Sequence, residues 1–373
     1  MAENKNAGTV LEVGPDLLRS SEQRTGGRVP TPKYDEDDVL SALESCYDLG
    51  RWLSAKRTER AYSNDSWLVE TQAGDIFVRR SSPLKTRRSV RFECALIDHL
   101  VSAGYPAPAV LRTRDGDAVV EIDGLEHVAT RWLPGTMFKR NDRAHLAVAA
   151  RALSRYHHLV AGLPTDLSAR QSSALLDVHT AGLQKLADAM EVNTPMMDDA
   201  VRVGAEANAA FLSEQTELVW KQLDDVLDDL TYLIIHGSFT TSALLLVGNT
   251  LSGVVDFDRA RHEVLSVDLA YAIDHFCRAK DKHGVKHIDK RRYLKFLEHY
   301  RPTSPATDTD IETLPLLLRA QRLGKVMKRS GSVMAKHAVT PRRPKDAVGF
   351  AEMLAKETAR VRLLEKHLPD PSL

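Results

Sequence analysis

Apolar and polar residues alternate with a two-residue period in several short runs of the first third of the chain. Residues 66–71 and 76–80 alternate on either side of a turn at 72–75, which predicts an antiparallel hairpin. Two more short strands are predicted at 118–122 and 127–133. This alternation is typical of a small antiparallel sheet with one face against a core.

Helical periodicity surrounds these strands and then dominates the chain. A helix is predicted from Asp35 to Gly50, with acidic residues in its first turn, and another over 88–103. After a hinge at Leu133-Pro134-Gly135, further helices are predicted at 143–162, 173–192, 197–230, 266–280, 288–300, 309–330 and 345–368. A buried hairpin at about 234–260 interrupts them.

The order of these elements predicts an α+β fold with two lobes. Residues 1–33 are polar and are expected to form a flexible tail. Residues 34–134 are expected to form an N-terminal lobe of a small antiparallel sheet with helix. Residues 135–373 are expected to form a larger, mostly helical C-terminal lobe. A cleft between two such lobes is a usual place for a ligand.

Composition narrows the class of protein without identifying it. The chain has 373 residues, 43% apolar and 27% charged, with a formal net charge of zero. These values are those of a globular protein, and they give no indication of nucleic-acid binding. Neither a signal peptide nor a run of apolar residues long enough to span a membrane is visible. The three cysteines form no CxxC pair, so a reducing, cytoplasmic location is expected.

The buried hairpin carries the candidate chemistry. It reads IIHGSFTTSALLLVGNTLSGVVDFDRA and ends in Asp256 and Asp258. Carboxylate oxygens are ligands that Mg²⁺ prefers, which predicts a metal at Asp256. The turn after His236 carries only hydroxyls, at Ser238, Thr240, Thr241 and Ser242.

This arrangement resembles the aminoglycoside phosphotransferase and choline kinase group, whose pattern here is H-G-D-x-x-x-x-N, a hairpin, and then (I/V)-D-F. Shorter matches extend the resemblance over residues 35–300: Ser63-Asn-Asp-Ser-Trp67, Phe77-Val-Arg79, Glu93, Leu153-Ser-Arg-Tyr-His157 and Val267-Asp-Leu-Ala270. It implies a protein-kinase-like fold that binds ATP or GTP with Mg²⁺. It places Asn64, Ser66, Arg79 and Glu93 on the nucleotide side, and Asp256 at the metal.

Three positions depart from the pattern of the group. Ser238 stands where the resemblance implies a catalytic aspartate, Ala243 where it implies a metal-binding asparagine, and Arg79 where it implies a lysine. Asp258 and His236 are the candidate substitute bases, since Asp258 would share a strand face with Asp256 and His236 has a suitable intrinsic pKa.

Several of these residues also have an ordinary structural interpretation. Arg79 and Glu93 can form a simple ion pair, His236 can bind a nearby backbone carbonyl or carboxylate, and Asp258 can bind its own turn. Asp268 is predicted to brace the turn that holds His236. For Asp256 the functional interpretation is favoured, because its strand is apolar and an unpaired buried carboxylate would be costly.

One basic stretch of the sequence belongs to none of the motifs above. From Arg322 to Lys345 there are eight Lys or Arg residues and no acid, with a predicted loop at Ser330-Gly331-Ser332. It is either a solvated helix end and linker or a docking surface for an acidic partner.

The sequence is therefore compatible with three functions from different classes. The first is a phosphotransferase with an atypical active site, moving a γ-phosphate to a hydroxyl of a small molecule or of a peptide in natural-product biosynthesis. The second is a pseudokinase that binds or scaffolds another enzyme. The third is a structural protein without a ligand.

Overall fold

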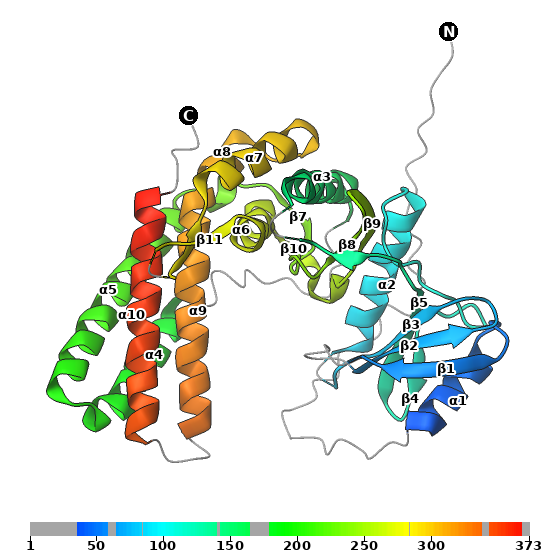
Figure 1. Ribbon diagram of the computed structural model, residues 1–373, viewed down its shortest axis with the longest axis horizontal. Coiled ribbons are helices and arrows are strands. Elements are labelled where there is room, and N and C mark those ends of the chain that lie inside the picture. The colour runs from blue at the N-terminus through cyan, green and yellow to red at the C-terminus, as the bar shows by residue number, and fades with distance from the viewer. Residues whose placement is uncertain are drawn as a thin grey trace, which may run out of the picture.

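A computed structural model describes residues 36–58, 65–83, 85–139, 142–164, 179–282, 284–337 and 343–367. Figure 1 shows two lobes, a sheet lobe built from the first part of the chain and a helical lobe built from the rest. The predicted α+β, two-lobed fold is confirmed. The predicted tail at residues 1–33 lies outside the described residues.

The N-terminal lobe is a five-stranded antiparallel sheet in the order β1-β2-β3-β5-β4. Its strands are β1 (Trp52–Arg57), β2 (Asp65–Thr71), β3 (Ile76–Arg80), β4 (Val120–Ile122) and β5 (Leu125–Arg131). The hairpin of β2 and β3 was predicted, whereas β1 was not. β1 escapes a pattern search because Leu53 through Arg57 are all exposed, so its residues do not alternate between core and solvent.

Two helices cover the two faces of this sheet, α1 (Glu36–Cys46) and α2 (Arg87–Ser102). The face that carries Trp67 and Val78 packs with Leu43 of α1 in one buried cluster. Successive side chains of a strand point to opposite faces, so Arg79, next to Val78, points to the other face. There it meets Glu93 of α2.

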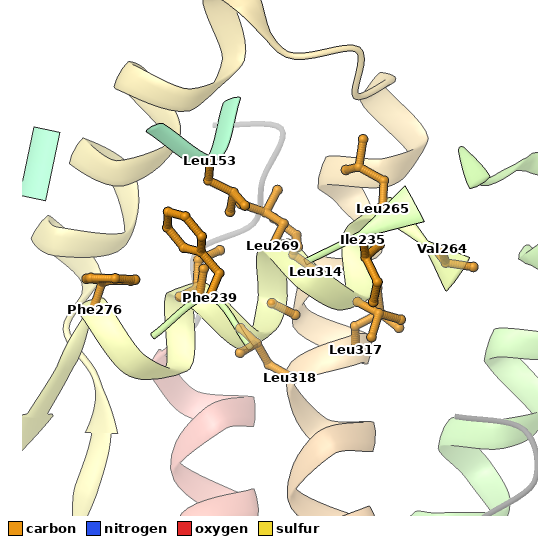
Figure 2. Packing of buried hydrophobic residues seen from close by; sticks show 14 of the residues in the cluster. Leu153, Ile235, Phe239, Val264, Leu265, Leu269, Phe276, Leu314, Leu317 and Leu318 are labelled. Atoms are coloured by element: carbon orange, nitrogen blue, oxygen red, sulfur yellow. The ribbon is translucent and has the colours of Figure 1, made fainter. Parts of the chain in front are cut away.

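The C-terminal lobe is mostly helical. Its helices are α3 (Arg143–Val160), α4 (His179–Asn193), α5 (Asp199–Asp224), α6 (Leu265–Phe276), α7 (Lys290–Tyr300), α8 (Asp308–Glu312), α9 (Leu314–His337) and α10 (Pro344–His367). The helix α6 lies at its centre and packs against α9, while α4, α5 and α10 also pack on α9. Figure 2 shows the junction, where Leu269 of α6 lies among Leu314, Leu317 and Leu318 of α9.

Three small antiparallel sheets complete this lobe. They are β6 (Thr136–Met137) with β8 (Leu244–Val247) and β9 (Thr250–Val254), β7 (Tyr232–Ile235) with β10 (Arg261–Val264), and β11 (Arg278–Lys280) with β12 (Lys286–Ile288). The predicted hairpin is the pair of β8 and β9. Thr136 pairs with Leu246, so the chain joins the second lobe directly after the predicted hinge.

Two predictions about the helices are wrong. A helix over 266–280 was predicted, but α6 ends at Phe276 and β11 follows, because the chain turns back at Gly284 with a positive φ of 76°. A loop was predicted at Ser330-Gly331-Ser332, but α9 continues to His337. The small residues lie in the contact with α4, where a Cβ on Gly331 would come within 3.2 Å of the Lys185 side chain.

The basic stretch is therefore not a continuous exposed surface. Its first member, Arg322, is buried in α9, and Arg329 is bound to Glu357 of α10. Pro344 occupies the first position of α10, where its missing N–H has no partner to lose. Within the described residues, no helix is both long enough and apolar enough to cross a membrane.

Candidate active site

The buried carboxylate of Asp268 holds the turn at His236-Gly237. The backbone N–H groups of His236 and Gly237 donate to the two oxygens of Asp268, at 2.8 and 3.0 Å. His157 also contacts Asp268, at 3.2 Å, and its other ring nitrogen contacts the Tyr300 hydroxyl at 2.6 Å. Burial raises the pKa of Asp268, but these partners outweigh it and hold that pKa below its ordinary value. The predicted bracing role of Asp268 is confirmed.

The ring of His236 lies inside the core. It is completely buried among the aromatic rings of Tyr156, Phe239 and Phe257, and its Nδ1 accepts from the backbone N–H of Ser238 at 3.3 Å. Burial lowers the pKa of His236. The neutral ring therefore supports the turn from within the core, in line with the structural interpretation.

The same turn packs closely against the loop that carries Asp256. Gly237 has φ +72°, and a Cβ there would come within 2.4 Å of the carbonyl oxygen of Arg259. Only glycine satisfies both the left-handed backbone and this close approach. The two segments that carry the candidate residues are thus fixed against each other.

Ser238 and Asp256 meet directly across this contact. The Ser238 hydroxyl donates to Oδ2 of Asp256 at 2.7 Å. Asp256 has φ 74°, and within the described residues Asp123 is the one other non-glycine residue with a positive φ. Such conformations cost free energy and gather at functional sites.

Two expectations for the carboxylates need correction. Asp256 was expected to be buried in an apolar strand, but β9 ends at Val254 and the left-handed turn leaves Asp256 exposed. Asp258 was expected to share a strand face with it, but a 3-10 turn, Phe257–Arg259, follows instead. The two carboxyl groups nevertheless interact directly.

Their pKa values move in opposite directions. Desolvation and the charge of Asp258 raise the pKa of Asp256 to about 7. Burial also raises the pKa of Asp258, but Lys85 and Arg79 outweigh it and lower that pKa below its ordinary value. Asp258 is therefore the ionised member of the pair near neutral pH, and a bound cation would relieve the repulsion between them.

A chain of ion pairs links Asp258 to the N-terminal lobe. Arg79 binds Glu93 through two hydrogen bonds of 2.6 and 2.8 Å, so the predicted pairing is confirmed. Lys85 lies between the lobes, with its Nζ 3.5 Å from Glu93 and 3.4 Å from Asp258. Lys85, Glu93 and Asp258 line a small pocket between α2 and the 3-10 turn, together with Phe92 and Phe257.

Lys85 was missed in the sequence. A lysine in a loop between a strand and a helix is common, and only the fold shows that this one points at Asp258. The available signal was its position, one residue before the N-cap Thr86 of the helix that carries Glu93.

The remaining predicted positions lie as follows. Ser66 is buried in β2 opposite Arg79, and Asn64 lies outside the described residues. Ala243 is completely buried and offers no ligand. Thr240 and Ser242 bond to each other at 2.8 Å, as ordinary loop residues do. The nucleotide and catalytic roles assigned to these positions remain predictions.

The metal ligands that the chain itself can supply are few. Within the described ranges, no group of three or more His, Cys, Asp and Glu side chains is placed to hold a metal. Two adjoining carboxylates remain at Asp256 and Asp258, with the pKa of the first raised by the second. This set fits Mg²⁺, which commonly binds one or two carboxylates and takes its other ligands from water and phosphates.

The chain is similar in sequence to known kinases. Homoserine kinases of Bradyrhizobium diazoefficiens and Rhodospirillum rubrum are 26% and 27% identical over 317 and 326 residues. These matches cover 85% and 86% of this chain, and 91% and 93% of those proteins.

Solved structures show the same fold. An amicoumacin kinase bound to AMP-PNP and Ca²⁺ has a TM-score of 0.63 at 14% identity, covering 87% of this chain and 94% of that one. An aminoglycoside phosphotransferase from Alicyclobacillus acidocaldarius has a TM-score of 0.60 at 15% identity, covering 91% and 98%. The model of the phosphotransferase enzyme family, APH, matches residues 54–303. The chain therefore belongs to the phosphotransferase enzyme family.

Proposed function

We propose that the protein is a kinase that transfers the γ-phosphate of ATP or GTP to the hydroxyl of a small alcohol, with Mg²⁺ as the metal. The observation that carries this proposal is the line of charges from Arg79 and Glu93 through Lys85 to Asp258. It joins the nucleotide side of the sheet lobe to the carboxylate pair. A protein without a ligand would have little need to hold Asp256 exposed in a left-handed turn.

The proposed site residues have two roles, metal binding and phosphate binding. Asp256 and Asp258 would hold the metal, which supplies positive charge to offset the phosphates. Lys85 and Arg79 are cations that suit phosphate oxygens, and the bidentate pair with Glu93 fixes the direction of Arg79. Asn64 and Ser66 stay the proposed contacts on the covering strand pair.

The acceptor hydroxyl would lie against Ser238. Its oxygen forms a bond to the γ-phosphorus, the bond from that phosphorus to the bridging oxygen of the nucleoside diphosphate breaks, and the hydroxyl proton passes to solvent water. Ser238 is bonded to Asp256 at 2.7 Å, so it can position the hydroxyl but cannot take the proton as an aspartate would. Phosphoryl transfer has a loose transition state and depends mainly on positioning and charge. The absence of a strong base slows the reaction by about 10²–10⁴.

His236 is not assigned the base role in this proposal. Its ring is buried under Tyr156, Phe239 and Phe257, away from any acceptor. We propose that it positions Ser238 through the backbone instead. Asp258, which is bound to Lys85, contributes negative charge and a metal ligand in this proposal.

Relatives of this chain are named homoserine kinases, which favours a small amino alcohol as the acceptor class. The same chemistry would serve a Ser or Thr hydroxyl of a peptide. A peptide acceptor in natural-product biosynthesis therefore remains the second acceptor proposed.

A pseudokinase is the competing function, and one observation favours it. The Ser238 hydroxyl already donates its hydrogen bond to Asp256, and Ala243 is completely buried. Such a protein would transfer no phosphate and would bind or scaffold another enzyme.

The test measures nucleotide binding and phosphoryl transfer separately. Calorimetry with ATP or GTP and Mg²⁺ measures the nucleotide affinity of wild type and of Asp256→Ala. The substitution should lower this affinity by more than ~10–100-fold, which is the cost of removing an outer-shell partner of a metal site. The double variant Ser238→Asp with Ala243→Asn should transfer phosphate to an alcohol faster than wild type, by up to about 10²–10⁴.

The outcomes separate the two functions. Transfer by wild type, increased in the double variant, supports the kinase. Binding by wild type with transfer only in the double variant overturns the kinase in favour of the pseudokinase. If wild type binds neither nucleotide, the kinase is excluded and a pseudokinase that scaffolds another enzyme is supported.

A further inference from the structure

A second cluster of charges lies at the end of α6, outside the site described above. Asp274 is buried there and contacts three cations. Arg278 lies 2.6 Å from its Oδ2 and Lys325 2.9 Å from the same oxygen, while Arg322 binds Oδ1. Two different helices and the strand β11 supply these groups.

The cluster has more positive charge than its one carboxylate can balance. The nearest other buried acid, Glu357, is already bound to Arg360 at 2.5 Å and to Arg329 at 2.9 Å. Burial lowers the pKa of Lys325, and the charge of Arg322 lowers it further, although Asp274 raises it. Burial lowers the pKa of the adjoining His275 to about 4, and the same cations contribute.

The cations reach solvent in a graded way. Lys325 has 34% of its side chain exposed, Arg278 17% and Arg322 9%. Arg322 therefore holds Asp274 within the core, and the more exposed Arg278 and Lys325 can contact a ligand.

The position of the cluster relates it to the candidate active site. Asp274 lies six residues after Asp268 on the same helix, a rise of about 9 Å. Tyr271 lies between them, close enough for its pKa to be affected by Arg259 and Asp256 on one side and by Asp274 on the other. In Figure 1, α9, which carries Arg322 and Lys325, is on the side of the helical bundle towards the sheet lobe.

We propose that this cluster binds a carboxylate of the acceptor, with Arg278 and Lys325 as its contacts and Arg322 with Asp274 as their support. The inference rests on the proposed function, and it narrows the acceptor to alcohols that also carry a carboxylate. An arginine fork and a lysine ammonium suit a carboxylate through charge-assisted hydrogen bonds. The anion would offset the excess charge around Asp274.

The experiment compares two alcohols that differ by the carboxylate alone, L-homoserine and 3-amino-1-propanol. Binding of each to the nucleotide-loaded full chain is measured by calorimetry, and phosphate transfer to each is measured separately. The variants are Lys325→Met and Arg278→Gln, both at partly exposed positions. Lys328→Met is the matched control, because Lys328 is exposed on α9 one turn beyond Lys325.

Wild type should bind homoserine at least about tenfold more tightly than the amine, as expected for charge-assisted contacts. Lys325→Met and Arg278→Gln should remove most of this preference and leave nucleotide affinity unchanged, and Lys328→Met should keep it. Equal binding of the two alcohols by wild type overturns the inference, whether or not phosphate is transferred. Carboxylate-dependent binding without transfer supports this site and contradicts the kinase, so the two failures are distinct.

Discussion

Two charge clusters of the protein, one at the hairpin and one at the end of α6, have excess charge of opposite sign. At the hairpin, two carboxylates adjoin, and partial desolvation with the charge of Asp258 raises the pKa of Asp256 to about 7. At the end of α6, three cations surround the single carboxylate Asp274. The first cluster suits a cation, and the second suits an anion.

The difference shows that the sign of the excess charge in a cluster indicates the class of ligand that the cluster can bind. Buried charges of one sign are tolerated when a partner of the other sign is present for part of the functional cycle. The Arg79–Glu93 pair, by contrast, is balanced within itself and serves as a fixed support. Each prediction below changes one cluster and leaves the other as its reference.

The largest effect is expected from Asp274→Asn. Removal of this charge leaves three cations facing an amide, and breaking a buried charge cluster costs about 3–5 kcal/mol of unfolding free energy. Urea denaturation at neutral pH measures the loss. Lys325→Met added to Asp274→Asn should recover part of it.

The control for this effect is Asp199→Asn on α5. Its ion pair with Arg202 is exposed, so its removal should cost less than about 1 kcal/mol. A loss that small for Asp274→Asn as well would contradict the view that the cations depend on this carboxylate.

A smaller effect is expected at the hairpin cluster from Lys85→Met. The substitution removes the cation between Glu93 and Asp258 and leaves Arg79 in place. Affinity for ATP with Mg²⁺ should fall about tenfold, or ~1.4 kcal/mol, and homoserine binding should not change. Lys290→Met, at an exposed position at the start of α7, is the control. Tighter nucleotide binding by Lys85→Met would identify Lys85 as a block rather than a contact.

Much of the fold follows from periodicity, and the failures have physical causes. The β2–β3 hairpin and the helix α2 follow from alternation and from one apolar face, because each packs one side against a core. β1 is exposed along its length and gives no such signal. α9 passes through Ser330 and Gly331 because the close approach of α4 favours small residues over helix propensity.

The candidate site was predictable where motifs are local. His236, Asp256 and the partnership of Arg79 with Glu93 follow from short patterns and their order along the chain. Lys85 and the Asp274 cluster could not be predicted in this way, since each depends on tertiary packing. Arg322 lies 48 residues from Asp274 in sequence, and in the sequence it had been grouped with an exposed basic stretch.

The smallest predicted effect concerns His275, which lies next to Asp274 on α6. Its pKa in the folded chain is about 4, below the ordinary 6.5, because burial disfavours the charged ring; Asp274 raises the pKa, and the neighbouring cations lower it. Between these values the unfolded chain binds more protons, so stability should fall as pH falls. From about pH 7.5 to about pH 6 the loss due to His275 is about 1 kcal/mol or less, and His275→Gln should remove that share of the total. His127 of β5 is the reference, because burial alone is the main cause that lowers its pKa to about 4. If homoserine binds at Asp274, NMR titration should show the His275 pKa rising while that of His127 stays constant. Equal shifts at both histidines would place the anion elsewhere.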